Sequence, residues 1–217
     1  MPQRFSFHQE ECMGVQLNFF NQSNDANHPQ IVIFQKNVAS DLDAPAVAWR
    51  VIKYCGQGDN HPFSFPLGLQ VGASDSHGNC TPQLEAQYGQ QFQMAPSTAG
   101  DRLAPAGYGA SSKEVQVLNA LPQGAINASC YKDGRLLAVK TAIAPRQKAI
   151  FEFKPSIWIG VASHIQQGQI MNSAIVSQMN TEISLLGISR ADIVMRGGGS
   201  GANSRPFSFS LENVVMC

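Results

Sequence analysis

Hydrophobic and polar residues alternate along much of the chain, in short runs bounded by turn residues. Alternation with a period of two is typical of a strand that buries one face, because successive side chains point to opposite sides. The run at 61–74 shows it clearly, with Phe63 and Phe65 on one face and Ser64 on the other. A similar run occupies 15–23. Few stretches show helical spacing, so the pattern predicts an all-β protein.

Turn residues divide the rest of the chain into further strands. Additional strands are predicted at 29–38, 44–55, 84–94 and 113–121, and within 181–216 around a Gly/Ser loop at 197–204. Residues 125–145 form a predicted hairpin, because Asp133-Gly134 is a favoured pair for a two-residue turn. The stretch 95–112 is rich in Gly, Pro and Ser and is predicted to be a long loop.

About ten strands separated by turns predict a single antiparallel β-sandwich, resembling a jelly roll, with long loops. A closed β-barrel is the structural alternative. We expect residues 1–14 to form an N-terminal arm and residues 15–217 to form the sandwich domain.

One late stretch, 150–175, is the most apolar part of the chain. It predicts a strand, a corner at Pro155 and a second strand that contains Trp158. No nucleophile, base or metal ligand stands out in it. We therefore expect Trp158 to be buried core, so that its truncation to alanine costs about 3–5 kcal/mol.

The charge balance narrows the classes of partner. The 217 residues include 15 Lys and Arg against 15 Asp and Glu, and charged residues make up only 14% of the chain. A nucleic-acid-binding protein needs a basic surplus, so no nucleic acid is expected, and an anionic membrane surface is disfavoured. A net charge of zero favours association over solubility. Composition therefore permits self-assembly as a homo-oligomer.

The sequence gives few signals of location. The N-terminal residues lack the apolar core of a secretory signal, and no window has the roughly 18 apolar residues of a membrane helix. We expect a protein without a transmembrane segment, either cytoplasmic or exported without a conventional signal peptide.

The cysteines and histidines do not form a recognisable metal motif. Five widely spaced cysteines predict reduced thiols, although Cys217, at the chain end, is a candidate for an intermolecular bridge. His61 follows Asp59 and His77 follows Asp75, so each is half of a conceivable metal or acid–base site. A metal-dependent hydrolase is one alternative, and turn residues with local hydrogen bonds are the other. No metal or cofactor is predicted.

Polar loops carry the candidate residues for a glycan. Lectin-like sites stack a sugar on an aromatic ring beside amide and carboxylate groups. Tyr88 and Tyr108, with Asp75 and Asn79, are the candidate ligand-binding residues. A carbohydrate- or surface-binding module is thus a second hypothesis beside self-assembly.

A short motif recurs three times. Residues 61–71 and 205–215 share the pattern Pro-Phe-Ser-Phe, and residues 4–7 read Arg-Phe-Ser-Phe. Each copy suits a half-buried strand, and the N-terminal copy is suited to pair with a sheet edge of its own or a neighbouring chain. The candidate assembly residues are Arg4, Phe5, Phe7 and Cys217.

Three segments carry a family resemblance: 18–38, 44–52 and 151–175. The matching residues are Asn18, Asn21, Phe34, Gln35, Ala48, Trp49, Pro155, Trp158, Ile159, Gly160, Gln167 and Gly168. Together they resemble the RhiA family, named for a rhizosphere-expressed, quorum-sensing-regulated bacterial protein, although Ile157 stands where that family has an aromatic residue. The resemblance implies a β-rich bacterial accessory protein and no catalytic residues. The first hypothesis is therefore a non-enzymatic, self-associating β-sandwich that forms an oligomer, filament or crystalline assembly.

Overall fold

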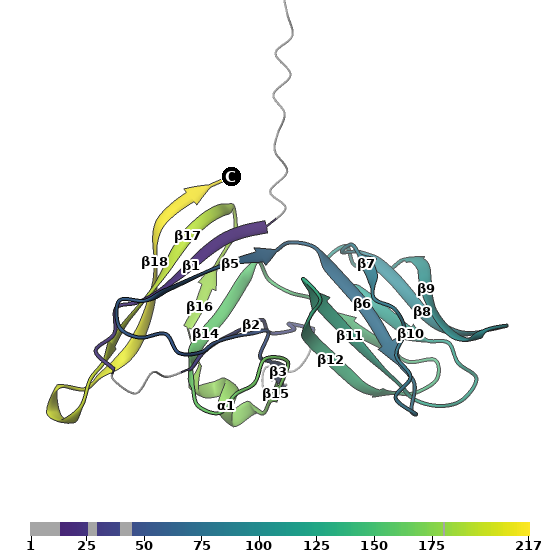
Figure 1. The fold of residues 1–217 in the computed structure, drawn as a ribbon. Helices are drawn as coiled ribbons and strands as arrows, with labels where there is room; N and C mark the ends of the chain where they lie inside the picture. Colours follow the sequence, from purple (N-terminus) through teal and green to yellow (C-terminus); the bar gives the residue numbers. More distant parts are fainter. Residues whose placement is uncertain (1–13, 26–29, 40–44, 180) are drawn as a thin grey trace, which may run out of the picture.

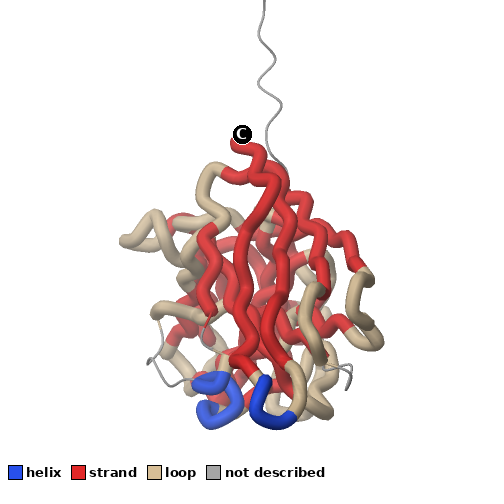
Figure 2. The backbone as a smooth tube through the Cα atoms, turned by 90° about the vertical axis from the view of Figure 1, so that its left-hand side faces the viewer, coloured by secondary structure: helices blue, strands red, loops and turns tan. Residues whose placement is uncertain are grey.

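The chain is almost entirely β. The computed structural model describes residues 14–25, 30–39, 45–179 and 181–217, and these contain eighteen strands, one short α-helix and one 3-10 helix. The tube in Figure 2 shows strands running through the whole body, with both helices at one end. The predicted all-β class is confirmed. Neither helix in the described ranges has the length and apolar character needed to cross a membrane.

The strands divide between two halves (Figure 1). The first half contains β1 (Gly14–Asn21), β2 (Gln30–Phe34), β3 (Ala46–Val47), β4 (Arg50–Ile52), β5 (Asn60–Pro66), β14 (Ser156–Ala162), β15 (Ile170–Met171), α1 (Ser173–Gln178), β16 (Thr181–Ser184), β17 (Ile188–Gly198), the 3-10 helix (Gly201–Asn203) and β18 (Arg205–Met216). The second half contains β6 (Leu69–Ser74), β7 (Leu84–Ala86), β8 (Gln90–Ser97), β9 (Gly100–Tyr108), β10 (Val115–Asn119), β11 (Ile126–Lys132), β12 (Arg135–Ile143) and β13 (Lys148–Phe151). The two ends of the described chain thus build one half, and its middle builds the other.

Each half contains two four-stranded sheets. Their strand orders are β18-β17-β1-β5 and β16-β14-β2-β4 in the first half, and β13-β10-β8-β9 and β12-β11-β6-β7 in the second. Strands β3 and β15 form a small additional sheet. Two pairs, β1 with β17 and β8 with β10, are parallel, so the pairing is not wholly antiparallel. The structure does not show the two sheets of one sandwich, and each of its sheets is open rather than closed into a barrel.

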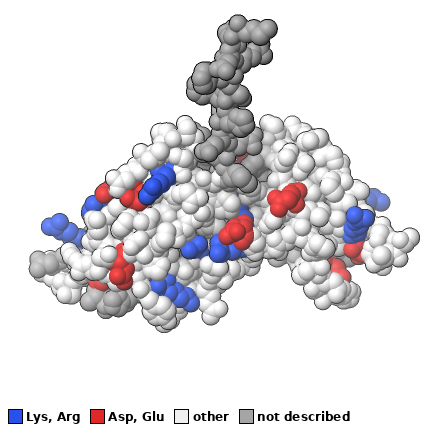
Figure 3. Space-filling model, turned by 45° about the horizontal axis from the view of Figure 1, so that its top comes forward, with Lys and Arg blue, Asp and Glu red and all other residues white. Residues whose placement is uncertain are grey.

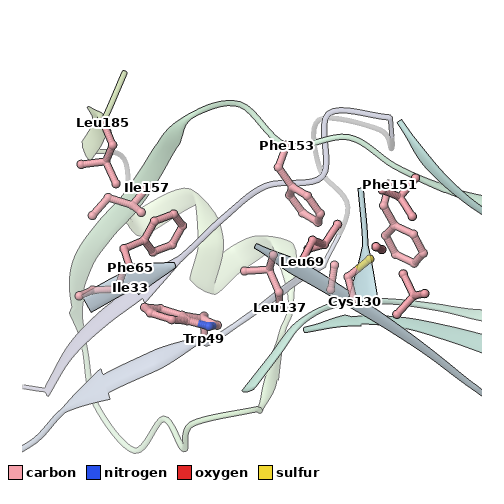
Figure 4. Packing of buried hydrophobic residues seen from close by; sticks show 14 of the residues in the cluster. Ile33, Trp49, Phe65, Leu69, Cys130, Leu137, Phe151, Phe153, Ile157 and Leu185 are labelled. Carbon is pink, nitrogen blue, oxygen red and sulfur yellow. The ribbon is translucent and has the colours of Figure 1, made fainter. Parts of the chain in front are cut away.

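One hydrophobic core extends through both halves. Trp49 lies near its centre, fully buried, with its ring edge-on to Phe65 at a centroid distance of 5.2 Å. Its indole Nε1 donates to the carbonyl of Lys132 at 3.1 Å, so the polar end of this large ring is also satisfied. Figure 4 shows Trp49 and Phe65 on one side and Leu69 and Leu137 nearby toward the second half.

Trp158 is less buried than the sequence suggested. Phe151, Ile157 and Ile159 are fully buried core, as expected for this stretch. Trp158 is instead half-buried against a smaller cluster, stacked on Phe34 and covered by the ammonium of Lys36 at 3.7 Å from the ring centroid. Alternation explains the difference, because neighbours on a strand point to opposite faces.

The chain first crosses between the halves at the β5–β6 link. Pro66 cannot donate to a ladder, and β5 ends there. The buried Lys132, at the end of β11, donates from Nζ to the carbonyls of Pro66 at 2.8 Å, Leu67 at 3.3 Å and Gly68 at 3.4 Å. Burial lowers the pKa of Lys132 to about 8, which leaves the ammonium largely protonated at neutral pH. One side chain therefore satisfies three backbone acceptors at the crossing.

The second crossing runs from β13 to β14. Here the buried side chain of Gln35 donates from Nε2 to the carbonyls of Lys154 at 2.9 Å and Ser156 at 2.7 Å. The amide of Val38 adds a bond to the carbonyl of Glu152 at 2.9 Å. Residues just after β2 thus hold the returning chain against the first half.

Of the other local predictions, two hairpins are confirmed and one loop is wrong. The hairpin at 125–145 is confirmed as β11 and β12, and its turn residues Asp133 and Gly134 both have positive φ, at 52° and 66°, as a tight hairpin requires. The predicted loop at 95–112 is wrong, because β9 lies within it and pairs with β8. Small side chains in this stretch hid its strand character. The Gly/Ser loop at 197–204 does join a hairpin of β17 and β18.

Replacing Lys132 with methionine tests the first crossing. Lys132→Met keeps most of the buried chain but leaves the carbonyls of Pro66, Leu67 and Gly68 without their donor. We expect the free energy of unfolding to fall by about 1.5–3 kcal/mol, the range for hydrogen bonds to a charged group. Urea denaturation measures it, and Lys113→Met, at an exposed lysine, is the control. Equal stability of the two variants would contradict this role.

Candidate functional site

Strand β18 is the outer edge of its sheet. Its 12 residues span roughly 40 Å, and β17 pairs with it on one side only. No strand of the described chain pairs with its other side. The pairing is regular from Ser208 to Glu212, which lie opposite Arg196 to Asp192 of β17. The unpaired side therefore offers a row of backbone donors and acceptors to another strand.

Alternation explains why this segment holds its place. Phe207, Phe209 and Leu211 are half-buried and pack against the main core, whereas Ser208 and Ser210 are exposed. The apolar side chains attach one face of β18 to the protein, and the backbone on its outer side is left open.

The alternation changes at Asn213. This residue has a positive φ of 50°, and the pairing with β17 shifts beside it. Beyond it, Val214, Val215 and Met216 are 44%, 51% and 61% exposed. Leu186, 69% exposed, lies in the turn next to the end of β18, where the amide of Cys217 donates to the carbonyl of Gly187 at 2.9 Å. We call Leu186, Val214, Val215 and Met216 the apolar tip.

Charge around this edge is sparse and balanced. Arg196 Nη2 pairs with Glu212 Oε1 at 2.7 Å, and its Nη1 donates to Ser210 Oγ at 3.2 Å. Both partners of the ion pair are exposed, so its contribution to stability is small. On the face in Figure 3, charged residues of both signs are scattered among uncharged ones. No strong field opposes the approach of a second copy on that face.

Another outer strand, β9, has features that discourage pairing. It contains Pro105, which lacks an N–H, and it has Gly100 and Gly107 with φ values of 106° and 100°. Proline and irregular backbone are common protections of sheet edges. In β18 the only proline is Pro206, near its start, and the positive φ is at Asn213, near its end, so the segment from Ser208 to Glu212 between them is regular and contains no proline. Of these two long outer strands, β18 is therefore better suited to pair with another strand.

The predicted assembly residues have mixed outcomes. Arg4, Phe5 and Phe7 lie outside the described residues. Cys217 directly follows β18 and is disulfide-bonded, so the expectation of five reduced thiols is wrong at this position. Cys217 does not offer a free thiol for an intermolecular bridge. Cys55, Cys80 and Cys130 are free.

The repeated Phe-Ser-Phe motif has a structural counterpart. Its two described copies lie in β5 and β18, which are the opposite outer strands of one sheet. In β5, Phe63 and Phe65 are buried while Ser64 is exposed, as the pattern predicted. The repeat therefore marks two equivalent positions in the sheet, of which β5 leads directly into the first crossing.

The predicted glycan residues do not form one site. Tyr88 and Tyr108 lie at one end of the β8–β9 hairpin, and Asp75 and Asn79 lie beside its turn at the other. Tyr108 is 77% exposed and Tyr88 is 40% exposed, and partial burial raises the pKa of Tyr88 to about 12. The length of β8, roughly 25 Å, separates the two groups.

Asp75 has a local structural role. Its carboxylate accepts from the amides of His77 at 2.8 Å and Asn79 at 2.9 Å, and from Asn79 Nδ2 at 2.7 Å. The bonds from Asn79, chiefly from its side chain, lower the pKa of Asp75. These are the local hydrogen bonds of a turn. A cavity of about 690 Å³ nevertheless adjoins Asp75 and Asn79, and Asp101 and Arg102 also line it.

In the described part of the chain, His61 and His77 lie in different halves and do not form a shared catalytic site. His61 lies in β5 of the first half, whereas His77 follows β6 in the second half. The described residues contain no cluster of three or more His, Cys, Asp or Glu side chains that could hold a metal ion. Burial raises the pKa of Cys55 and of Cys130, which makes both poor nucleophiles.

The β18 edge could not be recognised from the alternating pattern alone, since β5 has the same motif. The repeated Phe-Ser-Phe sequence was the available signal, but strand order decides which copy has an open side.

Comparison with family models, with curated proteins and with solved structures finds no match for this chain.

Truncating Phe209 tests how β18 is anchored. Phe209→Ala removes a half-buried ring from the core face, so we expect unfolding to become easier by about 1–2 kcal/mol. Amide hydrogen exchange should accelerate first in β18. Ser208→Ala, at the exposed neighbour, is the control. Uniform acceleration throughout the molecule, without a preference for β18, would contradict the local role.

Proposed function

We propose that this protein is a non-enzymatic building block that associates with further copies of itself through the β18 edge. The observation that carries this proposal is the open side of a 12-residue outer strand that ends in the apolar tip. Strand addition supplies backbone hydrogen bonds, and exposed apolar side chains add burial. Neither requires a cofactor or a catalytic group.

The simplest assembly pairs β18 with β18 of a second copy in an antiparallel, two-fold arrangement. Such an interface uses the same patch on both copies and closes as a dimer. When two exposed edge strands pair with each other, neither remains open to uncontrolled association with further chains. If β18 of one copy paired with a different outer strand of the next copy, the same contact could repeat from copy to copy and give a filament. We favour the closed dimer because it needs only the one surface described above.

The charge balance also supports this proposal. The formal net charge of zero gives little repulsion between copies.

We also propose that the protein acts outside the cytoplasm. The disulfide at Cys217 is typical of proteins in oxidising compartments.

We also propose that this chain is related to the RhiA family. Several matching residues have structural roles: Trp49 and Ile159 are buried core, and Gln35 holds the second crossing. The resemblance therefore supports a shared architecture, and it transfers no activity.

Charging the apolar tip tests the proposed interface. The double change Val215→Lys and Met216→Lys places two positive charges in the apolar tip. In an antiparallel pair centred on Ser210, the tip of one copy lies opposite Arg205 of the other, so pairing would bring like charges together. We expect sedimentation velocity to show an oligomer for the unmodified chain and a monomer for the variant. Ala106→Lys, on the exposed part of β9, should leave the oligomer intact. An unchanged mass for the double variant, or a monomer for the unmodified chain at every concentration, would contradict the proposal.

Removing residues 1–11 tests the proposed contribution of the N-terminal arm. Because β1 begins at Gly14 and the deletion stops before Cys12, every described strand and all five cysteines are kept. If the arm residues Arg4, Phe5 and Phe7 join copies, the shortened chain should sediment as a monomer. An oligomer that survives this deletion but not the tip variant would assign association to β18 and reject the arm.

Glycan binding is a second candidate, favoured by the cavity beside Asp75 and Asn79. Polar groups beside apolar Leu84 and Met94 could take a sugar hydroxyl face and a sugar carbon face. Immobilised glycans would test it. A hit that is weakened by Asp101→Asn and unaffected by Tyr108→Ala would place the site in this cavity, and no hit would reject the candidate.

A further inference from the structure

The disulfide at Cys217 raises the question of its partner. The chain has five cysteines, of which Cys55, Cys80 and Cys130 are free and Cys217 is disulfide-bonded. The fifth, Cys12, lies outside the described residues. Because a disulfide joins two cysteines, Cys12 is the cysteine of this chain that remains to pair with Cys217.

Strand order brings the beginning of β1 close to the end of β18. Strand β17 lies between them, parallel to β1 and antiparallel to β18, so β1 begins at the end of the sheet where β18 finishes. Gln16 of β1 lies opposite Arg190 of β17, and Arg190 lies opposite Val215 of β18. Figure 1 shows the start of β1 at the same end of the molecule as the C-terminus.

The remaining gap is short enough for a disulfide to close. Two strand spacings separate β1 from β18, roughly 10 Å, whereas the Cα atoms of a disulfide lie about 4.4–6.8 Å apart. Cys12 precedes Gln16 by four positions, and Cys217 follows Val215 by two. Since each extended residue spans up to about 3.5 Å, these two short segments have the length to meet beyond the start of β17.

Side-chain packing does little to hold the end of β18. Val214, Val215 and Met216 are all exposed, so they add no buried apolar contact. Pairing with β17 and the Oγ of Ser189, which donates to the carbonyls of Val215 at 3.0 Å and Met216 at 3.3 Å, hold the segment instead. Exposed backbone bonds with little apolar burial open readily. A covalent bond at Cys217, the next residue, therefore keeps the apolar tip beside β17.

We propose that Cys12 and Cys217 form a disulfide that controls association through the β18 edge. This inference rests on the proposed function, because it concerns the same edge. With the bond formed, the end of β18 is already ordered when a second copy pairs with it. With the bond broken, that end must be ordered during pairing, and the entropy cost weakens association.

The chemistry is thiol–disulfide exchange. A dithiol reductant supplies two electrons and two protons, so the S–S bond breaks, a thiol forms on Cys12 and on Cys217, and the reductant becomes a disulfide. A disulfide oxidant reverses the step. A reducing compartment would thus keep copies apart, and an oxidising one would permit assembly.

Peptide mapping of the full chain without reductant tests the pairing. We expect one linked pair of peptides, containing Cys12 and Cys217, and three thiols that react with a maleimide after denaturation, at Cys55, Cys80 and Cys130. A free thiol at Cys12 in the oxidised chain would overturn the proposal. This result does not depend on association, so it is separate from any test of the β18 interface.

Sedimentation velocity with and without dithiothreitol tests the control of association. We expect reduction to raise the dissociation constant by at least about tenfold, since ordering the backbone of even one residue costs about that factor. The double variant Cys12→Ser and Cys217→Ser should behave like the reduced chain under both conditions. Cys80→Ser, at an exposed free cysteine, is the matched control and should behave like the unmodified chain.

Two outcomes of this experiment would contradict different claims. Association of equal strength in both redox states would overturn the control by the disulfide and leave the β18 interface standing. A monomer in both states would overturn both proposals.

Hydrogen exchange keeps the test independent of folding. We expect reduction to accelerate exchange in the last residues of β18, while β6 and β11 of the second half keep their protection. Acceleration throughout the molecule would show that the bond supports the whole fold, and it would overturn a specific role at the β18 edge.

Discussion

The arrangement of this protein depends on how backbone carbonyls are satisfied where the chain crosses between its halves. A strand satisfies its carbonyls by pairing, but a crossing segment leaves its sheet and loses that partner. Lys132 donates to three carbonyls at the first crossing, and Gln35 donates to two at the second. Both donor side chains are buried, while the carbonyls at the first crossing are only partly so. These bonds hold the crossing segments beside the continuous core around Trp49.

The first crossing also distinguishes the two outer strands of the sheet β18-β17-β1-β5. At one side of the sheet, β5 leads into the first crossing and its end is fastened by Lys132. At the opposite side, β18 pairs only with β17, and its last residues are exposed apolar ones. The two outer strands share the same Phe-Ser-Phe pattern, yet their surroundings differ. The proposed association uses the strand that the fold does not fasten.

The local patterns predicted much of the strand content and little of its arrangement. The alternation of Phe63 and Phe65 and the Asp133-Gly134 turn depend on near neighbours, so both could be predicted. The change of sheet after Pro66 could not, because the alternation continues from β5 into β6 without a break. Strand β9 was missed because its small and polar side chains have no apolar rhythm.

Site residues were harder to predict, since they depend on contacts between distant segments. Tyr108 and Asp75 lie in stretches of similar composition, but the length of a hairpin separates them. The hydrogen bonds of Gln35 depend on the position of residues 154–156, more than a hundred positions away. No short window of sequence contains that information.

Amide hydrogen exchange at low and high protein concentration tests the proposed β18 interface most directly. Our account predicts that the outward-facing amides between Ser208 and Glu212, which do not bond to β17, become protected as concentration rises, because a second copy pairs with the open side of β18. Amides of β9, the other long outer strand compared above, should exchange at the same rate throughout. Protection in β18 that does not change with concentration, or that rises in β9 instead, would contradict the central claim.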